Sequence, residues 1–128
     1  MLLLHHGTTR QRAEAIVRNG PDPDFREKNQ QCPSEGFSTA PAFGTFGFGE
    51  PGKCAMRKAN LFSKEGGPVI LEFELPDELA REIVGDLRKP WESGKASNFG
   101  DELNFAVGFG IERLLLAWPG LTKRILDV

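Results

Sequence analysis

Hydrophobic residues near the start of the chain change from a continuous run to a helical spacing. The run 2–4 is entirely apolar, which predicts a short buried strand that ends at His6 and Gly7. Thr8, followed three residues later by Gln11, is typical of a capping box at a helix start. The next apolar residues recur at helical spacing and stop before a glycine suited to a helix end: Ala13, Ile16, Val17 and Gly20.

The clearest strand pattern lies at 68–75, where apolar and acidic residues alternate. Pro76 and Asp77 then predict the start of a short helix, because proline and acidic residues are favoured in a first turn. In the strand the apolar face holds Val69, Leu71, Phe73 and Leu75, and we expect Glu72 and Glu74 on the outer face.

The rest of the chain alternates between weaker patterns and polar, glycine-rich or proline-rich stretches. Strands are expected at 36–40, 102–107 and 121–128, helices at about 51–62 and 110–118, and loops at 20–36 and 85–101. Strands mixed with helices, without strict alternation, predict an α+β domain around one split or strongly bent sheet with peripheral helices.

Length and composition agree with one soluble globular domain spanning 1–128. The chain has 39% hydrophobic and 27% charged residues, as ordinary globular proteins do. A net charge of −2 argues against a protein that mainly coats nucleic-acid phosphates. The opening apolar run is too short for a signal peptide or a membrane span, so we expect a cytoplasmic protein with no membrane partner.

The cysteines and histidines do not have the spacing of a metal site. Cys32 and Cys54 are far apart in sequence, and His5 and His6 are adjacent to each other but near neither cysteine. Zinc ligands usually occur in closely spaced pairs, so no metal site is expected and both thiols are interpreted as free. His5 points to the opposite face of its strand from His6 and is interpreted as a structural or surface residue.

Three short segments carry the chemical information. His6-Gly7-Thr8 follows a strand, Gly-Phe-Ser-Thr-Ala at 36–40 follows a long loop, and Glu102 leads a later strand. Together they resemble the ADP-ribosyltransferase superfamily, which includes poly(ADP-ribose) polymerases and RNA 2′-phosphotransferases. The resemblance implies that His6 hydrogen-bonds a ribose hydroxyl of the donor nucleotide and that the Gly7 backbone holds the nicotinamide amide. Thr8 would contact the same ribose or hold the turn.

The second segment departs from the family at one position. Gly36, Phe37 and Ser38 resemble the start of a Gly-hydrophobic-Tyr-Phe-Ala segment whose tyrosine stacks on the nicotinamide, so Ser38 stands in the place of the tyrosine. The chain has ten phenylalanines and no tyrosine. We expect nearby phenylalanines to supply the ring face that the tyrosine would give, with Phe37, Phe43, Phe46 and Phe48 as the candidates.

The third segment supplies the candidate catalytic carboxylate. The resemblance implies that Glu102 bonds the 2′-hydroxyl of the nicotinamide ribose and stabilises the oxocarbenium-like centre as nicotinamide leaves. An anion is suited to that position because positive charge develops on the sugar. Three other glutamates compete for the role, of which Glu112 is expected to face solvent on a helix and Glu72 and Glu74 to line the outer face of their strand.

The resemblance therefore implies an NAD-dependent enzyme that transfers ADP-ribose, with NAD as the donor substrate and His6 and Glu102 as catalytic residues. The acceptor can be a protein, a nucleic acid or a small molecule. Basic residues are in excess in the first half of the chain, which holds most candidates for the NAD pyrophosphate: Arg10, Arg12, Arg26, Arg57 and Lys58. No glycine-rich Rossmann or P-loop motif is present.

Three other functions stay open at this point. One is a catalytically inactive module of the same fold that binds a nucleotide or an ADP-ribosylated ligand, and the missing tyrosine favours it. Another is an RNA 2′-phosphotransferase-like enzyme, which would need a basic face for RNA. The third is a protein-interaction module that uses the phenylalanine-rich loop.

Overall fold

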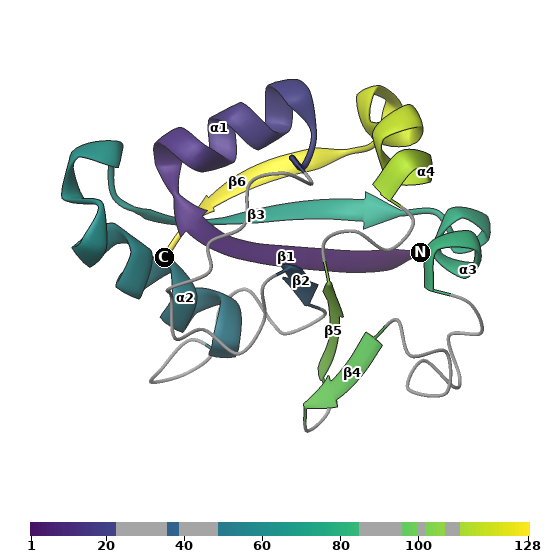
Figure 1. Ribbon diagram of the computed structural model, residues 1–128, viewed down its shortest axis with the longest axis horizontal. Coiled ribbons are helices and arrows are strands. Elements are labelled where there is room, and N and C mark those ends of the chain that lie inside the picture. Colours follow the sequence, from purple (N-terminus) through teal and green to yellow (C-terminus); the bar gives the residue numbers. More distant parts are fainter. Residues whose placement is uncertain (23–35, 39–48, 85–95, 100–101, 107–110) are drawn as a thin grey trace.

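The computed structural model shows a sheet with helices on both faces (Figure 1). It describes residues 1–22, 36–38, 49–84, 96–99, 102–106 and 111–128. The strands are β1 (Leu2–Thr9), β2 (Gly36–Ser38), β3 (Pro68–Leu75), β4 (Ala96–Phe99), β5 (Glu102–Ala106) and β6 (Lys123–Asp127). The helices are α1 (Arg10–Asn19), α2 (Gly49–Leu61), α3 (Asp77–Val84) and α4 (Ile111–Ala117), with 3₁₀ turns η1 (Ser63–Glu65) and η3 (Trp118–Gly120). The expected α+β class is confirmed.

The sheet has six strands in the order β4-β5-β2-β1-β3-β6, and every neighbouring pair is antiparallel. Its longest ladder joins β1 to β3, where each residue of β1 has a partner, from Leu2 opposite Leu75 to Thr9 opposite Pro68. β6 pairs with the other edge of β3. The strand predicted from the apolar alternation of 68–75 is confirmed, and it lies inside the sheet because β1 and β6 pair with its two edges.

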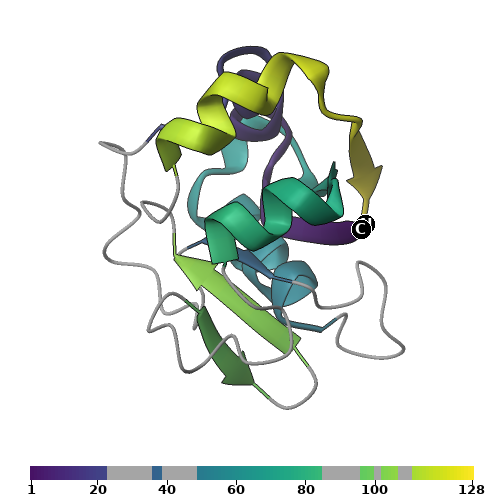
Figure 2. The ribbon, with the colours of Figure 1, turned by 90° about the vertical axis from the view of Figure 1, so that its right-hand side faces the viewer.

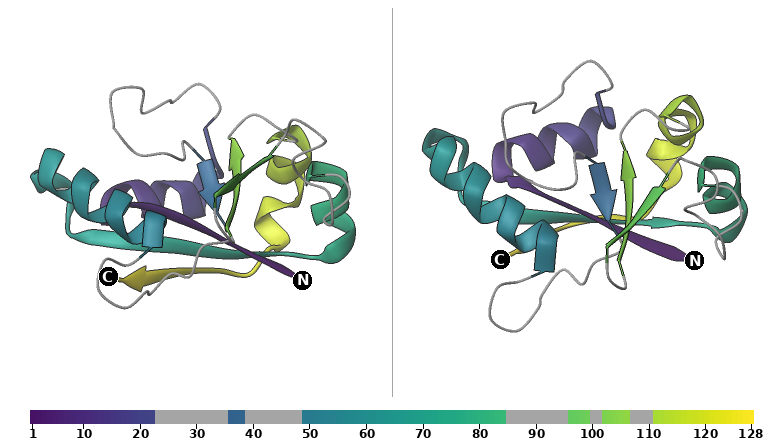
Figure 3. Two further views of the ribbon diagram at one scale, coloured as in Figure 1. Left: turned by 90° about the horizontal axis from the view of Figure 1, so that it is seen from below. Right: turned by 60° about the horizontal axis from the view of Figure 1, so that its bottom comes forward.

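The two halves of the sheet meet at one place. Among the described residues, the ladder between β1 and β2 consists of a single pair, His5 opposite Ser38. β2, β5 and β4 turn away from the direction shared by β1, β3 and β6 (Figures 1 and 3). His5 therefore lies where two differently directed halves join.

The apolar core lies on one face of the β1-β3-β6 half. Leu4 and Phe73 are register partners, and both are buried in it. Further core side chains come from β3 and from helices α1, α3 and α4, where they include Ala13, Leu79, Ala80, Ile83 and Leu114. Figure 2 shows the ribbon of α4 above that of α3. Trp118 closes the cluster, because its ring meets Phe73 edge-on at 5.1 Å and its Nε1 donates to the carbonyl of Val17 at 3.1 Å.

The first strand is longer than its sequence predicts. We expected it to end at His6 and Gly7, with Thr8 capping the helix, but β1 continues to Thr9. Thr9 is the N-cap, and its Oγ1 accepts from the Arg12 N–H at 3.3 Å. The cause is tertiary, since β3 supplies partners for the last residues of β1 and this pairing outweighs the weak strand preference of glycine.

One further element was missed, and several were predicted well. A loop was expected over 85–101, but β4 forms within it because β5 offers a pairing edge to an otherwise polar segment. The strands at 68–75, 102–107 and 121–128 and the helix that begins at Asp77 are confirmed within a residue or two. The segments 39–48 and 85–95, with their phenylalanine-rich and polar stretches, lie outside the described residues.

The shift of the helix cap by one residue gives a matched pair of substitutions. Thr9→Ala removes the cap and the hydrogen bond from Thr9 Oγ1 to Glu65 (3.0 Å), so it should lower the free energy of unfolding by about 1–2 kcal/mol. Thr8 is fully buried and its Oγ1 has no hydrogen-bond partner among the described residues, so Thr8→Val should leave that free energy within about 0.5 kcal/mol of wild type or raise it. Urea unfolding measures both, and a larger loss for Thr8→Val would contradict the assignment.

Candidate functional site

The three motif segments fall on three neighbouring strands. His6-Gly7-Thr8 lies in β1, Gly36–Ser38 forms β2, and Glu102 begins β5 opposite Phe99 of β4. Because the order within the sheet is β5-β2-β1, segments far apart in sequence become adjacent. The remaining phenylalanines considered as ring donors, Phe43, Phe46 and Phe48, lie outside the described residues.

One row of register partners crosses the whole sheet and is polar on every strand. It contains one residue from each strand, in spatial order Ser97, Asn104, Ser38, His5, Glu72 and Arg124. We call these six positions the polar row. Glu102 precedes Asn104 by two residues on the same strand, so it lies two register positions away from the polar row. The polar row thus passes through all three strands that carry the motifs.

The two histidines lie on opposite faces of β1, because successive side chains of a strand alternate. His6 is the register partner of Leu71, which belongs to the apolar core, and it is half-buried. His5 lies on the other face, in the polar row, and is 5% exposed. The surface alternative for His5 is therefore wrong: it is a buried residue of the face opposite the core.

His5 begins a chain of charged and polar contacts that spans three strands. Its Nε2 lies 3.0 Å from Oε2 of Glu72, and the other carboxylate oxygen of Glu72 accepts from the guanidinium of Arg124. Glu72 was expected on an outer face, but it is only 8% exposed, whereas the side chain of Arg124 is largely in solvent. The alternation of faces along β3 was predicted correctly. It could not show that the face of Glu72 is also covered.

The electrostatics of Glu72 follow from these contacts. Burial by itself raises the pKa of a carboxyl group, since it disfavours the anion, but the hydrogen bonds from His5 and Arg124 outweigh it. The pKa of Glu72 is accordingly lowered from its usual value, and the group is an anion near neutral pH. A fixed carboxylate beside a buried imidazole is a common way to orient that ring.

Two buried polar atoms have no hydrogen-bond partner in the part of the chain that the structure describes. They are Nδ1 of His5 and Oγ1 of Thr8, on opposite faces of β1. Most buried polar atoms in folded proteins are satisfied, so each exception calls for a physical reason. The Nδ1 atom is the more informative of the two, because the same ring is already held on its other side by Glu72.

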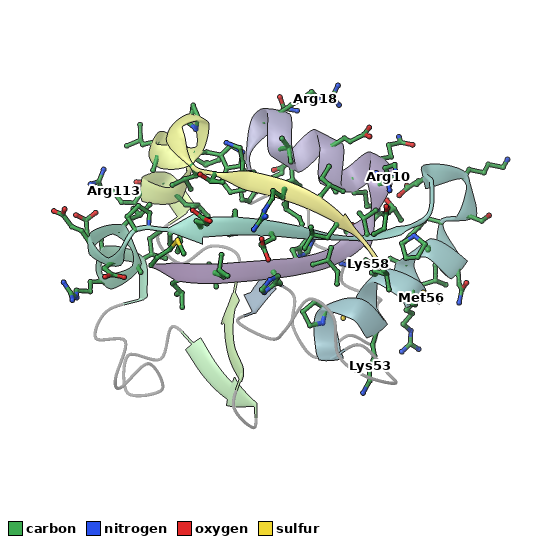
Figure 4. The ribbon with its side chains drawn as sticks, turned by 180° about the vertical axis from the view of Figure 1, so that it is seen from behind. Arg10, Arg18, Lys53, Met56, Lys58 and Arg113 are labelled. Atoms are coloured by element: carbon green, nitrogen blue, oxygen red, sulfur yellow. The ribbon has the colours of Figure 1, made fainter. Side chains whose placement is uncertain are left out.

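Gly7 is enclosed by helix α2. A Cβ built at Gly7 would lie 1.7 Å from the carbonyl oxygen of Pro51, so only glycine allows this approach of helix and strand. The Gly7 carbonyl accepts from Nζ of Lys58 at 2.9 Å, and Lys58 is 3% exposed. Figure 4 shows Lys58 lying against the sheet while Lys53, on the same helix, extends away from the fold. The sequence named Lys58 only as a candidate for the NAD pyrophosphate and gave no sign that this lysine is buried against β1.

The basic candidates for the NAD pyrophosphate have separate environments. Arg12 donates to Glu65 at 2.7 Å and stacks over Phe62, with its guanidinium carbon 4.0 Å from the ring centroid. Arg10 pairs with Asp127 at the end of β6. Lys58 is buried, Arg57 is exposed on α2, and Arg26 lies outside the described residues.

Among the described residues there is no group of three or more histidine, cysteine, aspartate or glutamate side chains that could hold a metal ion. Within the same residues, the helices are too short or too polar to cross a membrane.

Comparisons with family models, with curated proteins and with solved structures found no match for this chain. The case for a function therefore rests on the residues themselves.

The contact between Gly7 and α2 can be tested by adding one methyl group. Gly7→Ala would force the new Cβ against the Pro51 carbonyl and the Ala55 backbone nitrogen, so we expect a loss of about 2–3 kcal/mol of unfolding free energy. Gly67→Ala is the control, since nothing lies within 4 Å of a Cβ there. Equal stability of the two variants in urea unfolding would show that α2 does not lie against Gly7.

The lowered pKa of Glu72 predicts a pH dependence with a definite sign. A carboxyl group whose pKa is lower in the folded than in the unfolded protein stabilises the fold above its usual pKa of 4.5, and this contribution is lost as the pH falls through the lowered value. Glu72→Gln should therefore cost about 1–3 kcal/mol near neutral pH, and the difference from wild type should shrink on acidification.

The matched control is Glu74→Gln, on the same face of β3 but outside the polar row. Both variants are compared with wild type by urea unfolding at a series of pH values from about 7 down to about 3. A Glu72→Gln difference that stays constant over this range would contradict the assigned ion pairs.

Proposed function

We propose that this protein binds NAD and transfers its ADP-ribose group to an acceptor. The observation that carries the proposal is the adjacency of β1, β2 and β5, the strands that hold His6-Gly7-Thr8, Gly36–Ser38 and Glu102. The three segments were chosen for their resemblance to one family, and long stretches of chain separate them. Nothing in that choice required their strands to be neighbours in the sheet. The division of the sheet at the His5–Ser38 pair also fits the split sheet expected for an ADP-ribosyltransferase-like fold.

In the proposed reaction, the bond between the nicotinamide nitrogen and C1′ of its ribose breaks. Nicotinamide leaves with the bonding electrons, and positive charge develops on the sugar. A new bond forms from the acceptor to C1′, and the acceptor loses its proton. Glu102 has the role of stabilising the positively charged sugar and helping to activate the acceptor, because a preorganised anion acts directly on that charge.

The other roles follow the residue types. His6 is the proposed contact to a ribose hydroxyl, since imidazole can both donate and accept hydrogen bonds. The backbone around Gly7 and the β2 segment Gly36–Ser38 are proposed to hold the nicotinamide end, with phenylalanines in place of the absent tyrosine. The Gly7 carbonyl accepts from Lys58, which holds this part of β1 against α2.

A binding module without catalysis is the second candidate, and one observation favours it: no tyrosine exists anywhere in the chain to stack on nicotinamide. Such a module would bind NAD or ADP-ribose through the same strands and release no nicotinamide. Binding and turnover must therefore be measured separately.

The first measurement is thermal unfolding with NAD, ADP-ribose and nicotinamide. A ligand present at about 100 times its Kd stabilises the fold by about 2.7 kcal/mol, which raises the midpoint by several degrees in a domain of this size. We expect a shift with NAD and with ADP-ribose. If none of the three compounds raises the midpoint, both the transferase and the binding module are overturned.

The second measurement is nicotinamide release from NAD. Glu102→Ala should lower the rate by roughly 10²–10³-fold without removing NAD binding, since the carboxylate acts on charge that appears only in the transition state. Glu112→Ala is the matched control, an exposed glutamate on α4, and should keep the wild-type rate. NAD binding without release by wild type would establish the binding module, and equal release by wild type and Glu102→Ala would remove the role given to Glu102.

A further inference from the structure

The second histidine of the dipeptide has a structural setting that the proposed reaction does not use. His5 is 5% exposed, and it lies in the polar row directly between Ser38 on β2 and Glu72 on β3. Through Ser38 the row continues to Asn104 of β5, the strand that Glu102 begins. His5 thus belongs to the polar row, which passes through the strands proposed to hold the nicotinamide end. His6 lies on the core face of β1.

The contacts of His5 determine which nitrogen carries its proton. Glu72 is held as an anion by Arg124 and by His5 itself, and a carboxylate can only accept hydrogen bonds. The Nε2 atom, 3.0 Å from Oε2 of Glu72, must therefore be the protonated nitrogen. In the neutral ring Nδ1 is then left with a lone pair, which makes it a hydrogen-bond acceptor.

That acceptor has no partner among the described residues, although it is buried. Leaving a buried polar atom unsatisfied is costly, so an atom held in this state while the same ring contacts Glu72 calls for a physical reason. The ring cannot easily turn to satisfy Nδ1 internally, because doing so would break its contact with Glu72. The donor that completes it must come from outside the described chain.

We propose, on the basis of the proposed function, that Nδ1 of His5 accepts a hydrogen bond from a donor group at the nicotinamide end of the ligand. Two groups of that end have the right chemistry, a ribose hydroxyl and the carboxamide N–H. The pair His5–Ser38 is the one register pair between β1 and β2 in the described structure, so His5 lies at the junction between the strand that holds His6-Gly7-Thr8 and the strand that holds Gly36–Ser38. Glu72 and Arg124 are positioning residues, which act by holding the imidazole in the Nε2–H form.

The test uses the fact that the chain has only two histidines. Protein labelled with ¹⁵N-histidine gives two sets of ring signals, and His6→Gln assigns them. Before ligand is added, we expect His5 to show a protonated Nε2 and an unprotonated Nδ1. Addition of NAD should move the Nδ1 signal of His5 toward that of a hydrogen-bonded nitrogen and leave Nε2 nearly unchanged. Nicotinamide alone and ADP-ribose alone show whether the carboxamide or a ribose hydroxyl is the donor.

Variants supply an independent measurement. His5→Gln should weaken NAD binding by roughly three- to tenfold, the value of one hydrogen bond between neutral groups. Glu72→Gln should convert part of His5 to the other tautomer in the ligand-free spectrum and weaken NAD binding as well. Glu74→Gln, on the same face of β3 as Glu72 but outside the polar row, is the control and should keep wild-type affinity.

The outcomes separate this inference from the proposed function. If wild type binds NAD but the Nδ1 signal does not move, or if ligand-free His5 carries its proton on Nδ1, the inference is wrong and the proposed function is unaffected. If wild type binds none of the three compounds, the proposed function fails and the inference fails with it. Because the spectra are recorded on wild-type protein, the test does not depend on the folding of His5→Gln.

Discussion

The unbroken pairing of β1 with β3 is the constraint on which the rest of the structure depends. Each residue of β1 has a partner in β3, so no bulge interrupts the alternation of side chains along either strand. One face of the pair therefore carries Leu4 and Phe73 into the apolar core, and the other carries His5 and Glu72. A shift of one residue in this register would turn one strand over relative to the other, so His5 and Glu72 would lie on opposite faces and one of them would enter the core.

The sequence predicted those parts of the fold whose signals are local. The alternation at 68–75 and the proline and acidic residues after it specify β3 and the start of α3. The end of β1 could not be predicted in this way, because Gly7, Thr8 and Thr9 resemble a turn and a cap when they are considered without β3. β4 was missed for the same reason, since a segment of alanine, serine and asparagine becomes a strand only when β5 lies beside it.

The candidate site shows the same limit in a sharper form. Short segments marked β1, β2 and β5 as the strands of interest, and each of these strands exists. The polar row did not emerge from the sequence, because it is defined by register between residues far apart in the chain. For the same reason Glu72 was assigned to an outer face: alternation identifies the face of a residue but not whether another part of the chain covers it.

The central position of β1 also has a consequence for folding. β1 precedes every one of its partners in the chain, and its long ladder with β3 joins residues 2–9 to residues 68–75. Contacts between such distant segments form slowly, because a long loop must close before they contribute stability. During synthesis α1 can form from local interactions, but the apolar run 2–4 stays without its partner until β3 has left the ribosome. The strand that organises the finished sheet is therefore the segment most exposed to premature association.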